Sequence, residues 1–271
     1  MSKLNNESIN PIRKLYEEWE KQLYDEYEKL FPGAKYTIKD GVIFPEKYAE
    51  SRLKVMILNR EGYDLDGEGY PLHETIRKQI EEGVWFFEYQ RTLRLHIKQY
   101  LTVLELIKLG DGFLNLSDDY VRERVEAADY DELVRLMQSV AYCNVKKSDG
   151  LPRSNRMNLK EYAERGIDVI KKQIAFFNPS IILAGDVCSD ILDEIKDFKY
   201  GENLYIDPEC RVNIYQVEIN NQLFPLVDMF HPSRIKGMSE YYLDFLHALQ
   251  AVERYNPLFW NKRLNIKCFQ L

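Results

Sequence analysis

The sequence predicts an α/β protein, specifically a three-layer α/β/α domain with a central, mostly parallel sheet of about four strands and extra helices. The alternation of two kinds of segment leads to this prediction. Short apolar runs of strand length, such as Ile181-Ile182-Leu183-Ala184, alternate with longer amphipathic segments of helical period. Strands that alternate with helices usually form a parallel sheet covered on both faces. The 271 residues contain no repeat and no Pro/Gly-rich linker, so we expect one domain over residues 1–271.

The first half of the chain is expected to be mostly helical. Pro11 begins a charged amphipathic helix over residues 11–30, because proline fits the first helical turn. Residues 54–58, which are apolar after Lys54, predict a buried strand that runs into the polar loop NREGYDLDGEGY. We expect residues 1–50 to form an N-terminal helical extension. Residues 73–138 are expected to form a helical insertion, interrupted near Gly83 and with one or two helices in its last part.

The second half alternates strands and helices. The patterns predict strands at 139–145, 180–184, 212–219 and 224–229, and amphipathic helices at 159–177 and 240–255. The helix at 159–177 ends before Pro179, because proline disfavours helical geometry in the preceding residue.

Three polar clusters follow strands of this predicted sheet. They are NREGYD after the first strand, Asn144 after the second, and His231-Pro232-Ser233 after the last. Ligands of open α/β sheets bind outside the carboxyl ends of the strands. We therefore expect these clusters to converge on one edge of the sheet, although more than 80 residues separate them.

Composition argues against several classes of protein. The apolar runs are too short to span a membrane and the N-terminus lacks the apolar core of a signal peptide, so we expect a cytoplasmic protein. A net charge of −7 argues against broad adhesion to nucleic acid but allows a local basic groove. The four cysteines are far apart in sequence, which favours buried free thiols and no metal cluster or other cofactor.

Three segments carry a family resemblance through their order. They are VMILNREGYD, the stretch that begins YCNVKK and ends IILAGDVC, and LVDMFHPSRI. The first is similar to a strand followed by G-Q-D-P-Y-H, the second to T-N-x-V-K-C with its following helix and strand, and the third to a strand followed by H-P-S. Together they resemble the uracil-DNA glycosylase superfamily over about residues 54–64 and 139–250. Lys147 replaces the cysteine of the iron–sulfur branch, so the resemblance implies that the cluster is absent.

The resemblance implies catalytic roles for Glu61 and His231. Glu61 matches the carboxylate that positions water and stabilises the sugar cation formed when the glycosidic bond breaks. His231 matches the histidine that stabilises the base anion. Asn144 matches the asparagine that recognises the edge of the base, since an amide offers both a donor and an acceptor. Tyr63 matches the tyrosine that walls off the base pocket.

Further residues are candidates for binding a base that has flipped out of the DNA duplex. The aromatic rings of Phe86 and Phe87 are candidates for stacking on it. The candidate DNA contacts lie next to the motifs and are Ser233, Arg234, Ile235, Lys146 and Lys147. Of these, Ile235 is expected to fill the space that the flipped base leaves in the base stack.

The function implied is that of a monofunctional DNA glycosylase, because no lysine is placed as a nucleophile. Glu61 is one methylene longer than the family's aspartate and Arg60 adds bulk, so the expected target is uracil or a modified base. Two alternatives remain open: a catalytically silent protein that binds nucleic acid, a nucleotide or another protein, and a hydrolase of small nucleosides or nucleotides. The remaining histidines are expected to be structural; they are His73, His96 and His247.

Overall fold

A computed structural model describes most of the chain. The described residues are 10–32, 36–61, 69–84, 91–108, 113–148, 155–185, 187–188, 192–195, 198, 200–206, 212–229, 241–257 and 259–260. The strands are β1 (Gly41–Val42), β2 (Val55–Glu61), β3 (Val140–Lys146), β4 (Ile181–Gly185), β5 (Tyr200–Ile206), β6 (Val212–Ile219) and β7 (Gln222–Met229). The longer helices are α1 (Pro11–Leu30), α2 (Pro45–Glu50), α3 (Leu72–Glu81), α4 (Arg91–Lys108), α5 (Asp118–Ala127), α6 (Tyr130–Met137), α7 (Arg156–Phe177) and α8 (Tyr241–Tyr255).

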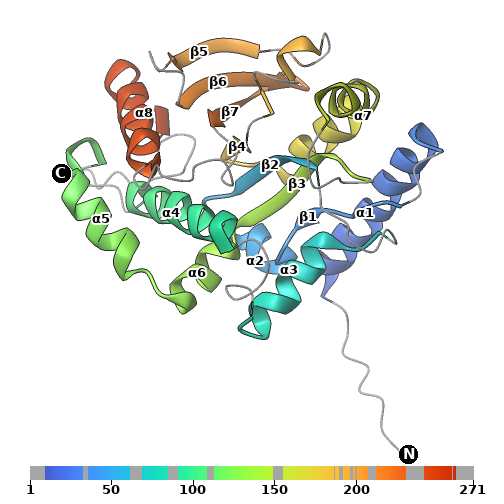
Figure 1. The fold of residues 1–271 in the computed structure, drawn as a ribbon, viewed down its shortest axis with the longest axis horizontal. Helices are drawn as coiled ribbons and strands as arrows, with labels where there is room; N and C mark the ends of the chain where they lie inside the picture. The colour runs from blue at the N-terminus through green and yellow to red at the C-terminus, as the bar shows by residue number, and fades with distance from the viewer. Residues whose placement is uncertain are drawn as a thin grey trace, which may run out of the picture.

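The fold is mixed α/β around one sheet, which confirms the predicted class (Figure 1). The strand order is β1-β3-β2-β4-β7-β6-β5, and the described sheet has seven strands, so the prediction of about four is too low. The four strands β3, β2, β4 and β7 are parallel neighbours at its centre. Strand β1 adds antiparallel at one end, and β6 and β5 add antiparallel at the other.

The two additional edge strands have weak local signals. Strand β1 has only two residues, Gly41 and Val42, which is too short for an alternating pattern. Strand β5 is mostly exposed or half-buried along its length and so lacks the apolar side of a typical strand. The short helix α2 falls within the N-terminal extension that was expected to be helical, and Pro45 stands in its first turn.

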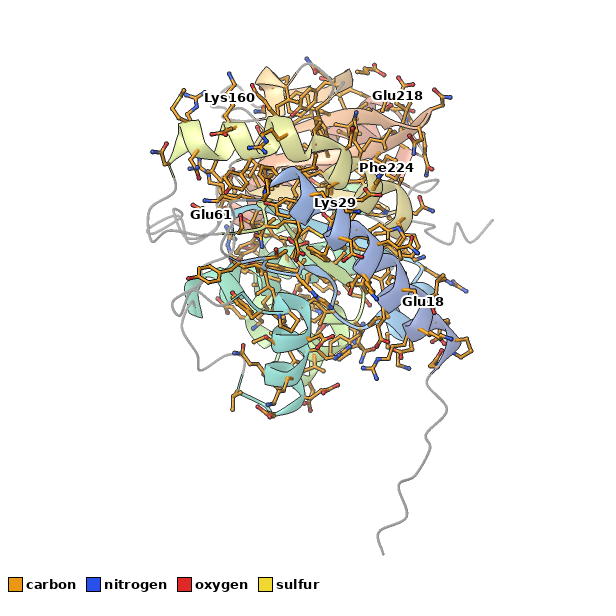
Figure 2. All side chains as sticks on the ribbon, turned by 90° about the vertical axis from the view of Figure 1, so that its right-hand side faces the viewer. Glu18, Lys29, Glu61, Lys160, Glu218 and Phe224 are labelled. Atoms are coloured by element: carbon orange, nitrogen blue, oxygen red, sulfur yellow. The ribbon has the colours of Figure 1, made fainter. Side chains whose placement is uncertain are left out.

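Apolar side chains of the central strands alternate between two faces of the sheet. Val55 and Ile57 belong to a core cluster with residues of α3, α4, α5, α6 and α8. Met56 and Leu58 belong to a second cluster with residues of α1 and α7. Figure 2 views the molecule from the side on which α1 and α7 lie. Helices therefore pack on both faces of the parallel strands.

The longest predicted helices are confirmed, and their caps explain their bounds. Asn10 accepts a hydrogen bond from the Ile12 amide at 2.9 Å at the start of α1. Asn155 caps the start of α7 in the same way, and Asn178 ends that helix with a left-handed φ of 47°. Gly83, with φ of 73°, follows α3, as the predicted interruption requires.

The end of β2 differs from the prediction in a way that matters for the site. Asn59, Arg60 and Glu61 belong to the strand, whereas the sequence placed them in a loop. Likewise Asn144 lies inside β3 and does not follow it. These polar residues extend the strands because their backbones continue the pairing between β2 and β3. Within the described helices, no segment is long and apolar enough to cross a membrane.

Candidate functional site

Polar side chains meet at the carboxyl ends of β2 and β3. The two strands are parallel and pair Asn59 with Asn144, and Glu61 with Lys146. Asn59 lies two residues after Ile57, and Asn144 two residues after Tyr142, so both asparagines point to the face of those core residues. The sequence predicted Glu61 and Asn144 at this edge, and the structure brings them together.

Several buried polar atoms here have no hydrogen-bond partner among the described residues. They are both amide atoms of Asn59, the amide nitrogen of Asn144 and one carboxylate oxygen of Glu61. Asn59 is 2% exposed and Asn144 is 1% exposed. Buried polar atoms are almost always hydrogen-bonded, and leaving one unpaired costs about 1–3 kcal/mol. Such a cluster indicates a place where a polar ligand completes the bonding.

The other carboxylate oxygen of Glu61 is engaged by Lys146. The two groups are 3.5 Å apart, and both side chains are nearly fully buried. The Lys146 ammonium also donates to Asn158 of α7 at 2.7 Å and lies 4.8 Å from the centre of the Tyr162 ring. Figure 2 shows Glu61 on the same side of the molecule as the amino-terminal part of α7, where Lys160 is labelled. Glu61 is therefore held through one oxygen while the other is available.

A fully buried ion pair binds the backbone of Asn144. The Lys147 ammonium is 2.9 Å from each carboxylate oxygen of Asp40. The same ammonium donates to the Asn144 carbonyl at 2.7 Å, and Asp40 accepts from the Asn144 amide N–H at 2.7 Å. Both backbone polar groups of Asn144 are thus held by one ion pair, which fixes the backbone from which its side chain projects.

Helices α1 and α7 complete the bonding of this pair. The Tyr24 hydroxyl donates to Asp40 at 2.9 Å, and the Gln173 side chain donates to it at 2.8 Å. The Tyr27 hydroxyl accepts from the Lys147 amide at 3.0 Å. Burial raises the pKa of Tyr24 well above its usual value, and the nearby Asp40 charge raises it further. The N-terminal extension is therefore built into the support of the site.

The burial of Lys146 and Lys147 does not favour the DNA contacts that the sequence predicts for them. Lys146 is 2% exposed and Lys147 is 0% exposed, so neither ammonium reaches the surface where a phosphate would lie. Their charges are already matched by Glu61 and Asp40. The sequence missed Asp40, which follows Lys39 in a segment without a motif. The available signal was the position of Lys147 at the end of an apolar strand, because a charge that is buried there needs a partner from elsewhere in the chain.

Several predicted site residues lie outside the described residues. They are Tyr63, Phe86, Phe87, His231, Ser233, Arg234 and Ile235. The site as described therefore consists of Asn59, Glu61 and Asn144, with their supporting pairs.

A small cavity lies beside Asn59 on the α4 side of the sheet. Its lining is mostly apolar, with Asn59 and Tyr100 as the polar exceptions, and includes Ile57, Leu183 and Met229. The Tyr100 hydroxyl is buried and has no hydrogen-bond partner in the described part of the chain. Burial raises the pKa of Tyr100 well above its usual value. Space of about 10 Å³ for the centre of a water molecule is enough for about one water or one small substituent.

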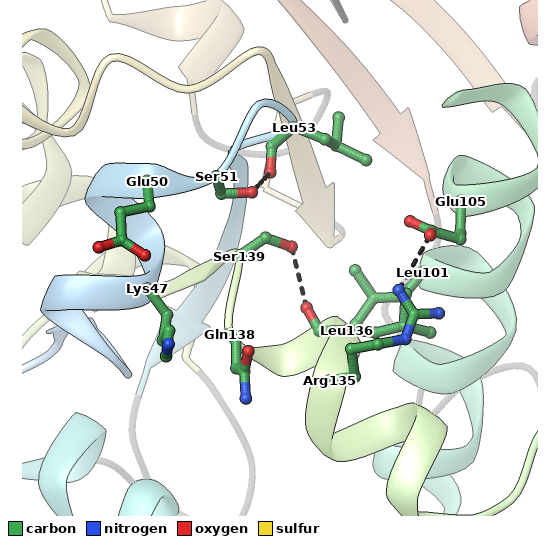
Figure 3. Close-up of a pocket in the computed structure, with 10 residues that line it drawn as sticks. All are labelled: Lys47, Glu50, Ser51, Leu53, Leu101, Glu105, Arg135, Leu136, Gln138 and Ser139. Atoms are coloured by element: carbon green, nitrogen blue, oxygen red, sulfur yellow. Dashed lines mark hydrogen bonds and ion pairs between the residues drawn. The ribbon is translucent and has the colours of Figure 1, made fainter. Parts of the chain in front are cut away.

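A second hollow lies at the opposite, amino-terminal edge of β2 and β3 (Figure 3). Some of its polar groups are bonded: Ser139 donates to the Leu136 carbonyl at 2.9 Å, and Arg135 donates to Glu105 at 2.9 Å. None of the buried polar atoms that lack a partner in the described part of the chain belongs to a residue that lines this hollow, in contrast to the carboxyl edge.

The described cysteines and histidines agree with structural roles. Cys143 and Cys188 are free and buried, as predicted, and burial raises the pKa of both thiols. His73 is buried between Glu20 and the Lys39 carbonyl. Cys210, Cys268 and the His96 side chain lie outside the described residues. Over the described ranges, no group of three or more His, Cys, Asp or Glu side chains is arranged to hold a metal ion.

Comparison with known proteins adds no family assignment. No family model matches the sequence, and no curated protein matches it.

Proposed function

We propose that this chain is a divergent member of the uracil-DNA glycosylase superfamily, with a three-layer α/β/α domain and a cytoplasmic location. In this proposal it binds a nucleobase at the carboxyl edge of the parallel strands and hydrolyses its N-glycosidic bond in DNA. One observation carries the proposal: Asn59, Glu61 and Asn144 leave buried donors and acceptors unpaired at one place. A planar base rich in donors and acceptors is a ligand that completes such a set.

Glu61 has the chemistry for the central step. Breaking the bond between base and sugar produces an oxocarbenium-like transition state, which a nearby carboxylate stabilises while it orients the attacking water. Lys146 holds one oxygen of Glu61 and leaves the other for this task. His231 is proposed to donate a hydrogen bond to the base as negative charge develops on it. Asn144 is proposed to bind the edge of the base.

The test is an assay for abasic sites on oligonucleotides that carry uracil or one of several modified bases. We expect the wild-type chain to release at least one base, and Glu61→Gln and His231→Ala each to lower the rate by about a hundredfold or more. Glu18→Gln, on the exposed face of α1, is the matched control and should leave the rate unchanged. Release of no base contradicts the glycosylase proposal, and binding without release favours the catalytically silent alternative. A rate that neither site substitution changes contradicts the site assignment.

A second candidate function is hydrolysis of a small nucleoside or nucleotide. It is favoured by the burial of Lys146 and Lys147, which removes two predicted phosphate contacts, and by the net charge of −7. Binding to DNA depends steeply on salt, because phosphate contacts release counterions. No salt-dependent binding to single-stranded DNA, together with release of a base from free nucleosides, would favour this candidate over the first.

A further inference from the structure

We propose that the groove between the carboxyl end of α1 and the start of α3 is a docking surface for an extended, arginine-containing peptide segment of a partner protein. The groove has a volume of about 730 Å³, against about 10 Å³ for the cavity beside Asn59. It lies outside the base-binding site proposed above, and this inference does not depend on that site.

Three segments of the chain form the walls of the groove, at residues 28–32, 36–39 and 69–74. The second and third segments are joined through their backbones, because the Lys39 amide donates to the Tyr70 carbonyl at 3.0 Å. Extended backbone paired in this way gives the groove one firm wall.

The wall at Gly69 is too tight for a side chain. Gly69 has a φ of 71°, and a Cβ atom at this position would lie 2.7 Å from the Thr37 carbonyl oxygen. The Ile38 amide donates to the Lys147 carbonyl at 2.7 Å, which joins the same segment to the carboxyl end of β3. The groove therefore has a defined shape before any partner binds, and such preorganisation lowers the cost of binding.

Aromatic and proline side chains supply the contact surface. Phe31 is 4% exposed, Tyr36 and Tyr70 are half-buried, and Pro32 and Pro71 are exposed. Aromatic rings attract guanidinium groups through cation–π interaction and stacking. Grooves lined by aromatic side chains also bind extended, proline-containing peptides. The lining therefore suits an extended peptide that carries arginine.

The charge of the groove favours a cationic partner. Two exposed carboxylates line it, those of Glu28 and Glu74, against the single ammonium of Lys39. Neither carboxylate forms an ion pair with another described residue. Helix α1 ends at the groove, and the carbonyl end of a helix carries partial negative charge. The net charge of −7 acts in the same direction over the whole chain.

An arginine of the chain itself already binds the end of α1. The Arg165 guanidinium of α7 lies 4.6 Å from the centre of the Phe31 ring and donates to the Leu30 carbonyl. Arg165 is not among the residues that line the groove. The groove thus offers a second place at this helix end where a guanidinium meets aromatic rings, with Glu28 beside it to match the charge.

Synthetic peptides test the inference on the full chain. The probe is Arg-Pro-Pro-Arg-Pro-Pro-Arg, in which every third residue is arginine, so that the guanidinium groups share one side of a polyproline II helix. The comparison peptide carries citrulline, a neutral analogue of arginine, at the same places. We expect the arginine peptide to bind with a Kd of about 100 µM or less, and the citrulline peptide to bind about tenfold more weakly, by isothermal titration calorimetry. Equal affinities, or binding of neither peptide, would overturn the inference.

Charge reversal locates the binding. The combined substitution Glu28→Lys and Glu74→Lys should weaken binding of the arginine peptide by about tenfold or more. Glu18→Lys with Glu81→Lys is the matched control, because it makes the same change in charge at exposed positions on the same two helices. The control should change the Kd by less than about twofold at about 0.1 M salt, where charges more than about 10 Å apart are largely screened. If both pairs weaken binding equally, the peptide responds only to net charge and the inference is wrong.

Substitution of an aromatic side chain tests the stacking surface. Tyr70→Ala should weaken binding of the arginine peptide by about fivefold, whereas Tyr120→Ala, at an exposed tyrosine of α5, should not change it. Circular dichroism confirms that each variant is folded before its affinity is interpreted. An oligothymidine that competes with the peptide and loses its binding in the Tyr70→Ala variant would assign the groove to single-stranded nucleic acid and overturn the peptide assignment.

Discussion

Asp40 and Lys147 form their ion pair across 107 residues of chain, with both side chains fully buried. Moving two charges out of water costs several kcal/mol, and only good geometry with further hydrogen bonds offsets it. Here Asp40 also accepts from Tyr24, Gln173 and the Asn144 amide. The pair also positions Asn144 of the candidate site, so we expect it to matter for the site as well as for the stability of the fold.

Asp40→Ala should lower the free energy of unfolding by about 3–5 kcal/mol, because it leaves the Lys147 charge buried without its partner. Lys147→Met should cost less than this, since an apolar side chain fills the space while Asp40 keeps its other donors. Urea denaturation measures both, and Glu18→Ala on the surface of α1 should change stability by less than about 0.5 kcal/mol. An effect of Asp40→Ala as small as that of the surface variant would contradict the role given to the pair.

Asn59→Leu should raise the free energy of unfolding of the ligand-free protein by about 1 kcal/mol. The substitution removes two buried amide atoms that lack partners within the described structure, and with them a cost of about 1–3 kcal/mol per group. Ser139→Ala serves as a contrast, because its hydroxyl is bonded to the Leu136 carbonyl and its loss should not stabilise. A clear destabilisation by Asn59→Leu would mean that its amide is satisfied inside the protein.

Helices α1 and α3 are joined by a buried histidine. His73 of α3 lies 3.3 Å from Glu20 of α1 and 3.2 Å from the Lys39 carbonyl. Burial lowers the pKa of His73, but the hydrogen bond and charge of Glu20 and the Lys39 carbonyl outweigh it, so the net pKa is raised above 6.5. When it is protonated, the histidine ties the N-terminal extension to the start of the helical insertion through its contact with Glu20.

This contact makes stability depend on pH in a defined direction. The folded protein holds the His73 proton more tightly than the unfolded chain, so the stabilisation is complete below about pH 6.5 and is lost as the pH rises through the folded-state pKa. His73→Gln should thus destabilise at pH 5.5 and do so less at pH 8.5, as measured by urea denaturation. Lys78→Gln on the exposed face of α3 is the control. A cost of His73→Gln that does not change with pH contradicts this assignment.

At the scale of the whole molecule, two hydrophobic cores share one sheet. One contains residues of α3, α4, α5, α6 and α8, and the other contains residues of α1 and α7. Adjacent residues of β2, such as Val55 and Met56, contribute to opposite cores. Loss of either core exposes one face of the same strands, so we expect the cores to unfold together.

Two tryptophans report on the two cores separately. Trp19 of α1 stacks on Phe176 at 4.1 Å between ring centres, and Trp260 is fully buried in the other core. Variants that keep only one of them, with the remaining tryptophans changed to Phe, should show the same urea midpoint by fluorescence and by circular dichroism. Separate midpoints would contradict the single domain predicted over residues 1–271.

The sequence by itself determined the elements that carry a strong local signal. The helix Pro11–Leu30 follows from its first-turn proline and amphipathic period, and the central strands follow from short buried apolar runs. The order of the polar clusters also placed Glu61 and Asn144 at one edge of the sheet, because carboxyl ends of parallel strands lie together. These features depend on neighbours in the chain or on topology alone.

Only the tertiary structure decided which polar residues are buried and what they contact. Lys146 and Lys147 look like surface cations in the sequence, and Asn59 looks like part of a loop. Their environments depend on residues far along the chain: Asp40 for Lys147, Asn158 of α7 for Lys146, and pairing with β3 for Asn59. A buried charge is stable only with a partner, and that partner is chosen by packing in three dimensions, which local pattern does not contain.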